Sequence, residues 1–490
     1  MGVKMPERGW LAGLWLVGKG GLWQDCAMSR TRKIITMLAL CLGLGAPVPA
    51  GADAVGALRE GLAAVQAKDW TAALTAARGA GAVGGDLILW HWLRAGEGRL
   101  GDYESFLARR PDWPGLALLR EKGEVAVARS TEPSRVIAWF AGGKPRTGAG
   151  AVALVRALAQ AGHPGEAEQA AFDAWASLRF APEDEVAMLA LQGDALSVAH
   201  ELRLDNLLWA GDRQAEAARM LPLVRGDFRA LAEVRLGLQR DTAGVSTLID
   251  RLPVSVQGDA GLAWDRFIWR MKKDRYDDAA TLILERSSSA AALGRPEAWA
   301  ERRALLARRA MREGEAKTAY RLASGHHLSG GDAFVDLEFL SGFIALRKLN
   351  DPARALTHFD RLKAAVKTPI SVARAEYWRG RALEAQGDTA GAKAAWQAAA
   401  RNQTAYYGLL SSERLGLSLD PALVKVGEAG PGWKTARFAG SSVLAAGRML
   451  AEAGDRTLAK RFFLHLAEGL NGEELGQLAA RWSSFSSPPA

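Results

Sequence analysis

Residues 377–400 read YWRGRALEAQGDTAGAKAAWQAAA, and the small and aromatic residues in this stretch have the spacing of a helical hairpin. Gly380 is followed twelve residues later by Ala392, four residues after that by Trp396, and three after that by Ala399. This order of small, small, large and small residues is typical of a tetratricopeptide-type repeat. The small residues let two helices approach closely, and the aromatic side chain fills the groove to the next pair. The stretch therefore predicts two antiparallel helices joined at the AQGD turn.

Similar spacings occur upstream of this hairpin. Equivalent alanines lie 39 residues apart (316 to 355) and then 37 residues apart (355 to 392), which is longer than the strict tetratricopeptide period. We interpret the pattern as a degenerate helical solenoid, in which each hairpin buries its apolar face against the next one. The upstream positions are Gly342, Ala355, Phe359 and Leu362 in one copy and Ala316, Tyr320 and Ala323 in the copy before it.

The rest of the chain up to residue 480 has the composition of successive helices. Ala, Leu, Arg and Glu dominate residues 53–480, and all four are good helix formers. Alternating β-branched runs of the strand type are nearly absent. Short breaks such as AGHPGE and WAGDRQ separate the apolar repeats and favour antiparallel helix pairs. The predicted fold class is therefore all-α, a superhelical solenoid of tetratricopeptide-like hairpins.

The net charge of +9 does not indicate a nucleic-acid partner. Residues 1–52 hold six Lys and Arg against two Asp and Glu, so residues 53–490 carry only 57 against 52, a net +5. Nucleic-acid binding would require basic residues gathered on one face. Both cysteines, Cys26 and Cys41, lie before residue 53, which excludes thiolate catalysis and cysteine-bound metal from the rest of the chain. No cofactor or metal is predicted.

A secretory signal peptide is predicted at residues 28–52. Basic residues near Met28 are followed by an apolar stretch, Ile34–Leu44, and by the small-residue site Ala50-Gly51-Ala52. The apolar stretch is shorter than the roughly 20 residues that a membrane-spanning helix needs, so no stable membrane insertion is expected. Residues 1–27 show no clear pattern and are interpreted as an over-extended start. The mature protein is expected to be exported.

The stretches TPISVARAEYWRGRALEAQGD (368–388) and AAWQAAARNQTAYYGLLSSERLG (394–416) resemble the end of the superhelical domain of periplasmic soluble lytic murein transglycosylases. Residues 336–359 and 202–224 resemble the same family, and residues 106–120 do so more loosely. The likeness covers roughly residues 55–470. It implies helices that close into a ring, then a small linker domain, then a lysozyme-like domain. In that family one glutamate cleaves the glycan of peptidoglycan without hydrolysis and leaves a 1,6-anhydromuramic end.

The resemblance also implies a domain organisation for this chain. It places a superhelical (ring) domain at residues 53–403 and part of a linker domain at residues 404–480. Tyr406 and Tyr407 lie at the boundary between these two domains. Two interpretations of these tyrosines stay open. They cap the core of the last hairpin, or they form an aromatic platform for sugar rings at a glycan or linker contact.

The catalytic motif of the family, Glu-Ser-x-Phe, is not found after residue 416. The nearest match is Glu104, Ser105 and Phe106, which lacks the residue that the motif has between Ser and Phe and lies among the first helices. Glu104 is therefore expected to be a solvated helix residue. Residues 481–490, RWSSFSSPPA, leave the helical pattern abruptly and are interpreted as an aberrant tail, such as a shifted frame or a premature stop produces. No catalytic residue is therefore predicted in this chain.

Other polar groups in the sequence are interpreted structurally. His326 and His327 are adjacent, so on a helix they would diverge by about 100° and could not share a metal ion; a loop pair is expected. His91 stands between two tryptophans and is expected to be a half-buried packing residue. The acidic residues 183–185 follow Pro182 and indicate a helix start, where carboxylates meet the positive end of the dipole. The arginines of residues 300–312 are expected to be solvated.

The leader predicts an exported protein, and the resemblance implies a periplasmic protein that binds peptidoglycan glycan strands, with other cell-wall proteins as further partners. Whole-gene activity as a transglycosylase is implied by the resemblance alone, and the chain itself is expected to be inactive. The alternative is a periplasmic helical-repeat adaptor for another protein. An aromatic and arginine-rich stripe would favour a glycan, whereas a continuous apolar groove would favour a peptide or partner helix.

Overall fold

The computed structural model describes residues 50–424 and 432–486, and every regular element in these two segments is helical. The predicted all-α superhelical fold is confirmed. The predicted over-extended start, nearly all of the predicted signal peptide and the last four residues lie outside the described residues. The first described helix begins at Ala50, within the small-residue site at the end of the predicted leader.

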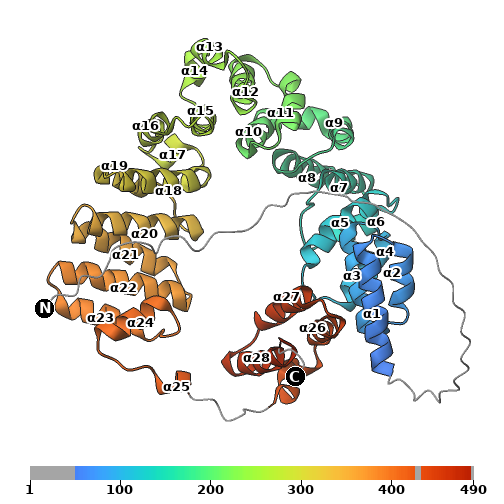
Figure 1. Cartoon of the computed structure of the whole chain (residues 1–490). Coiled ribbons are helices and arrows are strands. Elements are labelled where there is room, and N and C mark those ends of the chain that lie inside the picture. Colours follow the sequence, from blue (N-terminus) through green and yellow to red (C-terminus); the bar gives the residue numbers. More distant parts are fainter. Residues whose placement is uncertain (1–49, 425–431, 487–490) are drawn as a thin grey trace, which may run out of the picture. The chain divides into compact units, whose positions relative to one another are not determined.

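The helices follow one another as short antiparallel pairs, and Figure 1 shows these pairs in sequence order. Neighbours in the chain are neighbours in space, which is the packing expected of a solenoid. The helices up to residue 196 are α1 (Ala50–Gln66), α2 (Trp70–Ala77), α3 (Gly81–Ala95), α4 (Leu100–Arg109), α5 (Leu116–Ala128), α6 (Pro133–Phe140), α7 (Gly148–Gln160), α8 (Pro164–Ser177) and α9 (Pro182–Leu196).

The middle of the chain contains shorter helices among longer ones. Two 3-10 turns, η1 (Ser197–Ala199) and η2 (Leu221–Leu223), follow α9 and α11. The helices from residue 200 to residue 324 are α10 (His200–Ala210), α11 (Gln214–Met220), α12 (Gly226–Gln239), α13 (Val245–Asp250), α14 (Val254–Gln257), α15 (Ala260–Lys272), α16 (Tyr276–Arg286), α17 (Ala290–Leu293), α18 (Pro296–Arg312) and α19 (Ala316–Ser324).

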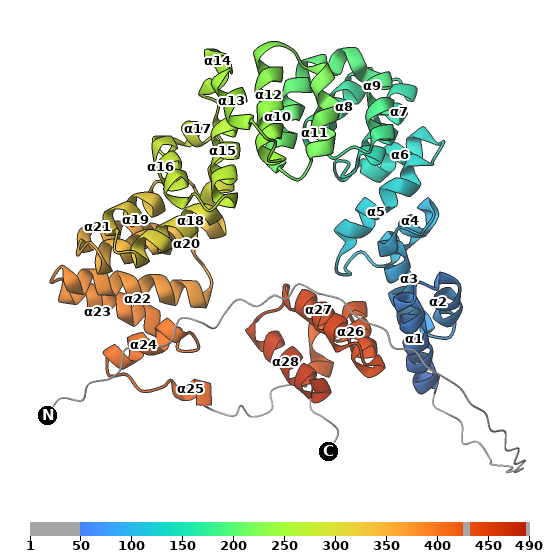
Figure 2. The same cartoon turned by 45° about the horizontal axis from the view of Figure 1, so that its top comes forward.

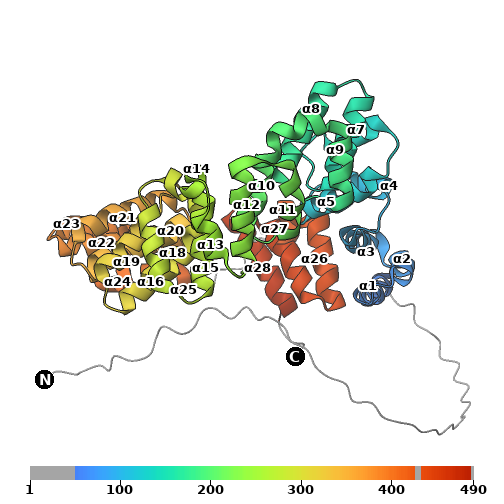
Figure 3. The same cartoon turned by 90° about the horizontal axis from the view of Figure 1, so that it is seen from above.

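The hairpins predicted from the repeat spacing are α18 with α19, α20 with α21, and α22 with α23, and Figure 3 shows them side by side. The remaining elements are α20 (Gly331–Arg347), α21 (Pro352–Ala365), α22 (Pro369–Ala385), α23 (Thr389–Ala400), α24 (Tyr406–Arg414), α25 (Pro421–Val424), η3 (Trp433–Thr435), η4 (Arg437–Gly440), α26 (Ser442–Ala453), α27 (Arg456–Ala467) and α28 (Gly472–Ser486).

The small residues of the repeat permit the close helix contacts that the sequence predicted. A Cβ atom at Gly380 would lie 2.6 Å from Cδ1 of the Trp396 ring, and the indole N–H of Trp396 donates to the carbonyl of Tyr377 at 3.2 Å. One repeat earlier, a Cβ at Gly342 would lie 2.6 Å from the ring of Phe359. In both hairpins the aromatic ring therefore packs directly on the backbone of the preceding helix.

The second helix of several hairpins begins with an aspartate cap. The carboxylates of Asp351, Asp388 and Asp455 each accept the backbone N–H three residues later, at 2.8 to 3.0 Å. These bonds satisfy amides that a helix start leaves unpaired. The breaks that the sequence shows as QGD and AGD are therefore helix starts as well as turns.

Helices α26 to α28 form a small C-terminal group that packs on the first helices of the chain (Figure 2). The ring centroid of Phe462 lies 5.8 Å from that of Trp90 and 5.3 Å from that of Trp113. The indole N–H of Trp113 donates to the hydroxyl of Ser442 at 2.9 Å, and His465 bonds the carbonyl of Asp112 at 3.0 Å. One apolar core thus joins segments more than 300 residues apart.

The interpretation of residues 481–490 as a break in the helical pattern is wrong as far as Ser486, because α28 continues to that residue. Residues 481–486 contain neither glycine nor proline, so nothing in their backbone ends the helix. The two prolines come only at positions 488 and 489, outside the described residues.

Gly408 is required by a close approach of two backbone segments. It lies in the first turn of α24, where a Cβ atom would overlap the backbone carbonyl of Asn402. A backbone atom cannot rotate aside, so we expect Gly408→Ala to cost about 2 kcal/mol or more of stability. Gly165→Ala is the matched control, because Gly165 also lies in a first helical turn and nothing lies within 4 Å of its Cβ position. Equal thermal midpoints for the two variants would contradict this explanation.

Candidate functional site

The two tyrosines of the predicted site occupy different environments on α24. Tyr407 packs with its ring centroid 5.3 Å from that of Tyr377 and joins the buried cluster of the last full hairpin. Tyr406 is 69% exposed and contacts Tyr407 edge-to-face at 5.1 Å. The interpretation that both tyrosines cap the core therefore holds for Tyr407 only. Tyr406 presents its ring to solvent because adjacent helical residues point about 100° apart.

A row of half-buried aromatic rings continues from these tyrosines across α22 to α20. The ring centroid of Trp378 lies 5.3 Å from that of Phe343, 5.9 Å from that of Phe339 and 6.5 Å from that of Tyr407. We call these four residues, together with Tyr406, the aromatic row. Because the rings are partly packed against one another, they stabilise the hairpin stack while leaving part of their surface accessible.

Arginines accompany the aromatic row. The guanidinium of Arg374 lies 4.6 Å from the ring centroid of Phe339, and that of Arg381 lies 6.0 Å from the ring centroid of Trp378. Both contacts are within the distance at which a cation is attracted to an aromatic face. An aromatic surface with arginines beside it is the kind of surface that favours a glycan ligand over a peptide.

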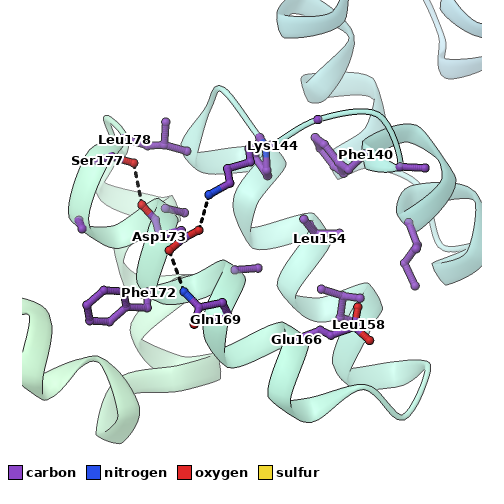
Figure 4. Close-up of a pocket in the computed structure, with 17 residues that line it drawn as sticks. Phe140, Lys144, Leu154, Leu158, Glu166, Gln169, Phe172, Asp173, Ser177 and Leu178 are labelled. Carbon is purple, nitrogen blue, oxygen red and sulfur yellow. Dashed lines mark hydrogen bonds and ion pairs between the residues drawn. The ribbon is translucent and has the colours of Figure 1, made fainter.

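A separate apolar cavity of about 640 Å³ lies between α6, α7 and α8 (Figure 4). At one edge of the cavity the ammonium of Lys144 contacts the carboxylate of Asp173 at 2.6 Å, and the amide of Gln169 donates to the other oxygen at 2.8 Å. These hydrogen bonds, that of Lys144 first, hold the pKa of Asp173 below its usual range. The apolar lining comes mainly from Ile137, Phe140, Leu154, Leu158, Phe172 and Leu178.

Buried carboxylates are the groups that a glycosidic reaction would use, and the structure engages them in ion pairs between helices. The guanidinium of Arg203 binds Glu185 of α9 at 3.0 Å and Glu216 of α11 at 2.5 Å. That of Arg235 binds Asp265 of α15 and Asp205 of α10, both at 2.7 Å. The predicted helix start at Pro182 is confirmed, but Glu185 is buried in this network rather than solvated at the helix end.

Burial raises the pKa of Asp265 to about 6 although the charge of Arg235 opposes the rise, and burial also raises the pKa of Glu124. The oxygens of Glu124 accept the backbone N–H groups of Arg146 and Thr147, both at 2.8 Å, and the hydroxyl of Thr147 at 2.6 Å. These donors belong to Thr147, the N-cap residue of α7, and to the residue before it. Glu124 therefore anchors a helix start, and these hydrogen bonds oppose the rise in pKa that burial causes.

Glu104, of the incomplete catalytic string, lies on α4 as predicted. Its half-exposed carboxylate is paired with the guanidinium of Arg135 at 2.6 Å, so it is not simply solvated. His91 is a half-buried packing residue, as predicted. Its ring meets Trp90 edge-to-face at 5.0 Å, and burial, aided by the charge of Arg94, lowers the pKa of His91 to about 4.

The predicted loop pair His326 and His327 is confirmed, but the two rings separate. His327 is exposed with a φ of 53°, whereas the buried His326 contacts Glu338 at 3.3 Å. His358 of α21 contacts the other oxygen of Glu338 at 2.5 Å and bonds the hydroxyl of Tyr320 at 2.8 Å. Sequence reasoning missed this buried group.

The interpretation of residues 300–312 as a solvated basic run is wrong for Arg303. This side chain is fully buried and donates to the carbonyl of Leu322 at 2.9 Å and to the hydroxyl of Ser287 at 2.7 Å. It lies on the face of α18 that meets α19, and those acceptors replace the water it loses.

In the described part of the chain, no three His, Cys, Asp or Glu side chains are placed to hold a metal ion, and no helix is both long and apolar enough to cross a membrane.

Comparison with proteins of known structure identifies the fold. The 70 kDa soluble lytic transglycosylase of Escherichia coli matches with a TM-score of 0.54 and 16% identity, over 88% of this chain and 68% of that one. The chain has the fold of a soluble lytic transglycosylase. The same enzyme in complex with bulgecin A gives the same values, and an inactive mutant of the transglycosylase Slt from Pseudomonas aeruginosa matches with a TM-score of 0.52 and 15% identity, over 90% of this chain and 70% of that one.

Sequence comparisons add nothing to this likeness. No protein-family model matches the chain, and no curated protein matches it either.

Proposed function

We propose that this chain binds the glycan strands of peptidoglycan as the superhelical portion of a lytic transglycosylase. The observation that carries the proposal is the fold likeness to soluble lytic transglycosylases, which extends over 88% of the chain. The aromatic row and its arginines supply a surface of the kind that sugar rings and carboxylates require. The parent activity in this proposal is non-hydrolytic cleavage of the muramic–glucosamine bond, which gives 1,6-anhydromuramic ends.

Export to the periplasm, with residues 28–52 as the signal peptide, is part of the same proposal. So is a division into a superhelical domain at residues 53–403 and a partial linker domain at residues 404–480. The chain by itself is proposed to be inactive. Two observations support this: the sequence after residue 416 has no Glu-Ser-x-Phe, and the buried Glu124 and Glu185 are engaged by neighbouring donors.

Sedimentation with purified murein sacculi tests both halves of the proposal. We expect the chain to sediment with the sacculi without releasing anhydro-muropeptides into the supernatant. Failure to sediment would refute the binding proposal, and released anhydro products would refute the proposed inactivity. Reading the gene beyond codon 480 in all frames is the companion test, because a frame that encodes Glu-Ser-x-Phe would identify the parent enzyme.

Tyr406 is expected to contribute to sacculus binding without contributing to stability. Its ring is exposed, so Tyr406→Ala should reduce the bound fraction severalfold while changing the stability by only about 0.5 kcal/mol or less. Ile370→Ala is the matched control, because Ile370 is equally exposed on α22 but lies outside the aromatic row. The glycan interpretation of Tyr406 is wrong if both variants bind sacculi as the unmodified chain does.

A periplasmic adaptor is the second candidate function, and the cavity in Figure 4 is the observation that favours it. Its apolar lining suits a side chain of a bound peptide better than a sugar ring. The adaptor function would be favoured if the chain does not sediment with sacculi but pulls down one defined periplasmic protein. The Leu154→Arg variant should then no longer bind that protein.

A further inference from the structure

A second, smaller hollow of about 280 Å³ lies between α5, α6 and the loop of residues 141–147. Two of its cations have no acidic partner among the residues that the structure describes. Arg120 is exposed and makes no hydrogen bond or ion pair there, and the guanidinium of Arg146 reaches only the carbonyl of Ala117, at 3.4 Å. Lys144 also lines the hollow, but its ammonium is paired with Asp173.

An indole ring forms part of the wall of this hollow. Trp139 of α6 packs so closely on α5 that a Cβ atom at Gly123 would lie 2.7 Å from its ring, and it meets Tyr103 edge-to-face at 6.2 Å. These contacts hold the ring in one orientation. The side chain is only half-buried, so the part of its surface that lines the hollow is available to a ligand.

The one carboxylate in the lining, that of Glu124, does not form an ion pair with either Arg120 or Arg146, so it does not neutralise their positive charge. Glu124 is buried, and its oxygens are occupied by the N–H groups of Arg146 and Thr147 and by the hydroxyl of Thr147. Its structural effect is to fix the loop that carries Arg146. The hollow therefore combines a rigid aromatic wall, a fixed loop and a surplus of positive charge.

We propose that this hollow binds one carboxylate-bearing sugar ring. Guanidinium groups match the planar geometry of a carboxylate, and Arg120 and Arg146 can approach one from two sides. The indole offers an apolar face to the C–H groups of a pyranose. The volume suits a single ring rather than a helix or a folded peptide. The identification of that ring as a muramic residue of peptidoglycan rests on the proposed function.

Binding of defined disaccharides by the full chain, measured by isothermal titration calorimetry, tests this proposal. The probes are a muramic–glucosamine disaccharide that carries the lactyl carboxylate, neutral chitobiose, and inorganic phosphate. We expect the acidic disaccharide to bind at least about tenfold more tightly than either of the others, since only it uses both the arginines and the indole.

Arg120→Gln and Arg146→Gln should each weaken the acidic disaccharide about tenfold, as expected when one charge-assisted hydrogen bond is lost. Arg129→Gln is the matched control, because Arg129 is an exposed arginine near the end of the same helix and outside the hollow. It should leave the affinity unchanged. Trp139→Phe keeps an aromatic ring against Gly123 and should weaken the disaccharide while leaving any phosphate binding unaffected.

The proposal is overturned if the acidic disaccharide does not bind, if chitobiose binds equally well, or if Arg120→Gln and Arg146→Gln behave like the control. If phosphate binds as tightly as the acidic disaccharide, the hollow is only an anion site, and the proposal of a sugar site is overturned. These results are separable from the proposed function. A chain that sediments with sacculi but does not bind the acidic disaccharide in calorimetry refutes this hollow and leaves glycan binding at the aromatic row intact.

Discussion

Arg203→Met should destabilise the chain around α9 to α11 by about 3 kcal/mol, because it leaves the buried Glu216 without an ion-pair partner and leaves Glu185 with only the half-buried Arg219. Arg203 is 1% exposed and binds both Glu185 and Glu216. Its guanidinium also lies 4.3 Å from the ring centroid of Trp175. Methionine replaces the aliphatic part of the side chain, so the expected loss comes from the ion pairs and from the hydrogen bonds to the carbonyls of Trp175 and Leu178.

Amide hydrogen exchange is the suitable measurement here, because it reports on the opening of the hairpins around Arg203 separately from the rest of the chain. Protected amides of α9 to α11 should exchange at least about a hundredfold faster in Arg203→Met, since 1.36 kcal/mol corresponds to a factor of ten. Amides of α20 to α23 lie in other hairpins and should be unaffected.

A triple variant separates the lost charge from lost packing. If Glu185 and Glu216 are also changed to Leu, no unpaired buried carboxylate remains. Arg219 loses its partner Glu185 but is about one-third exposed, so most of the protection should return. If Arg203→Met alone exchanges like the unmodified chain, Arg219 and the backbone N–H of Phe180 are sufficient to hold the two carboxylates, and the explanation is wrong. A triple variant as unprotected as the single one would show instead that the guanidinium is needed for packing against Trp175.

The hairpins of the C-terminal half were predictable because their signal is local. The distance between a small residue and the aromatic residue that packs on it, as for Gly380 and Trp396, is fixed within one hairpin. The sequence therefore shows both partners of the contact. Helix starts were predictable for the same reason, since a capping aspartate bonds an amide only three residues away.

The buried charges were not predictable, because a helix sequence does not show which of its charged residues faces a neighbouring helix. Arg203 and Glu216 are 13 residues apart on different helices, and Arg303 stands in a run of arginines whose other members are exposed or half-exposed. The contact between Trp113 and Ser442 spans 329 residues, and neither local sequence indicates it. Such contacts are set by the stacking of whole hairpins.

The candidate site was also predictable from the sequence only in part. The sequence singled out Tyr406 and Tyr407, yet only the position of α22 decides which ring is buried and which is free. Phe343 and Trp378 join the aromatic row through contacts between successive hairpins. The hollow beside Trp139 is lined by residues of two helices and a loop, so no single stretch of sequence indicates it.

Glu338→Gln should cost about 3 kcal/mol at neutral pH and progressively less as the solution is acidified. Burial disfavours the charge of Glu338, which is only 1% exposed, but hydrogen bonds from His326 and His358 outweigh burial and hold its pKa at about 2. Arg361 lies 3.5 Å from one oxygen and adds positive charge, and Tyr320 bonds the far nitrogen of His358. The variant removes the acceptor on which both rings converge.

The pH window follows from the direction of this shift. A carboxylate whose pKa is lower in the folded chain than in the unfolded one stabilises the fold above the unfolded value, near 4.5, and loses that effect as pH falls toward 2. The difference in stability between the unmodified chain and Glu338→Gln should therefore still be close to its full size at pH 5. It should then shrink steadily from pH 4.5 to pH 2.5.

Thermal midpoints from circular dichroism at pH 7, 5, 4 and 3 measure this difference, and subtraction of the two chains cancels the other titrating carboxylates. Asp332→Asn is the matched control, because Asp332 lies on the same helix but is exposed. It should change the midpoint by little at any of these pH values. A Glu338→Gln difference that stays the same at pH 3 and pH 7 would mean that the pKa of Glu338 is not depressed. The two histidines would then not be holding a charged carboxylate between them.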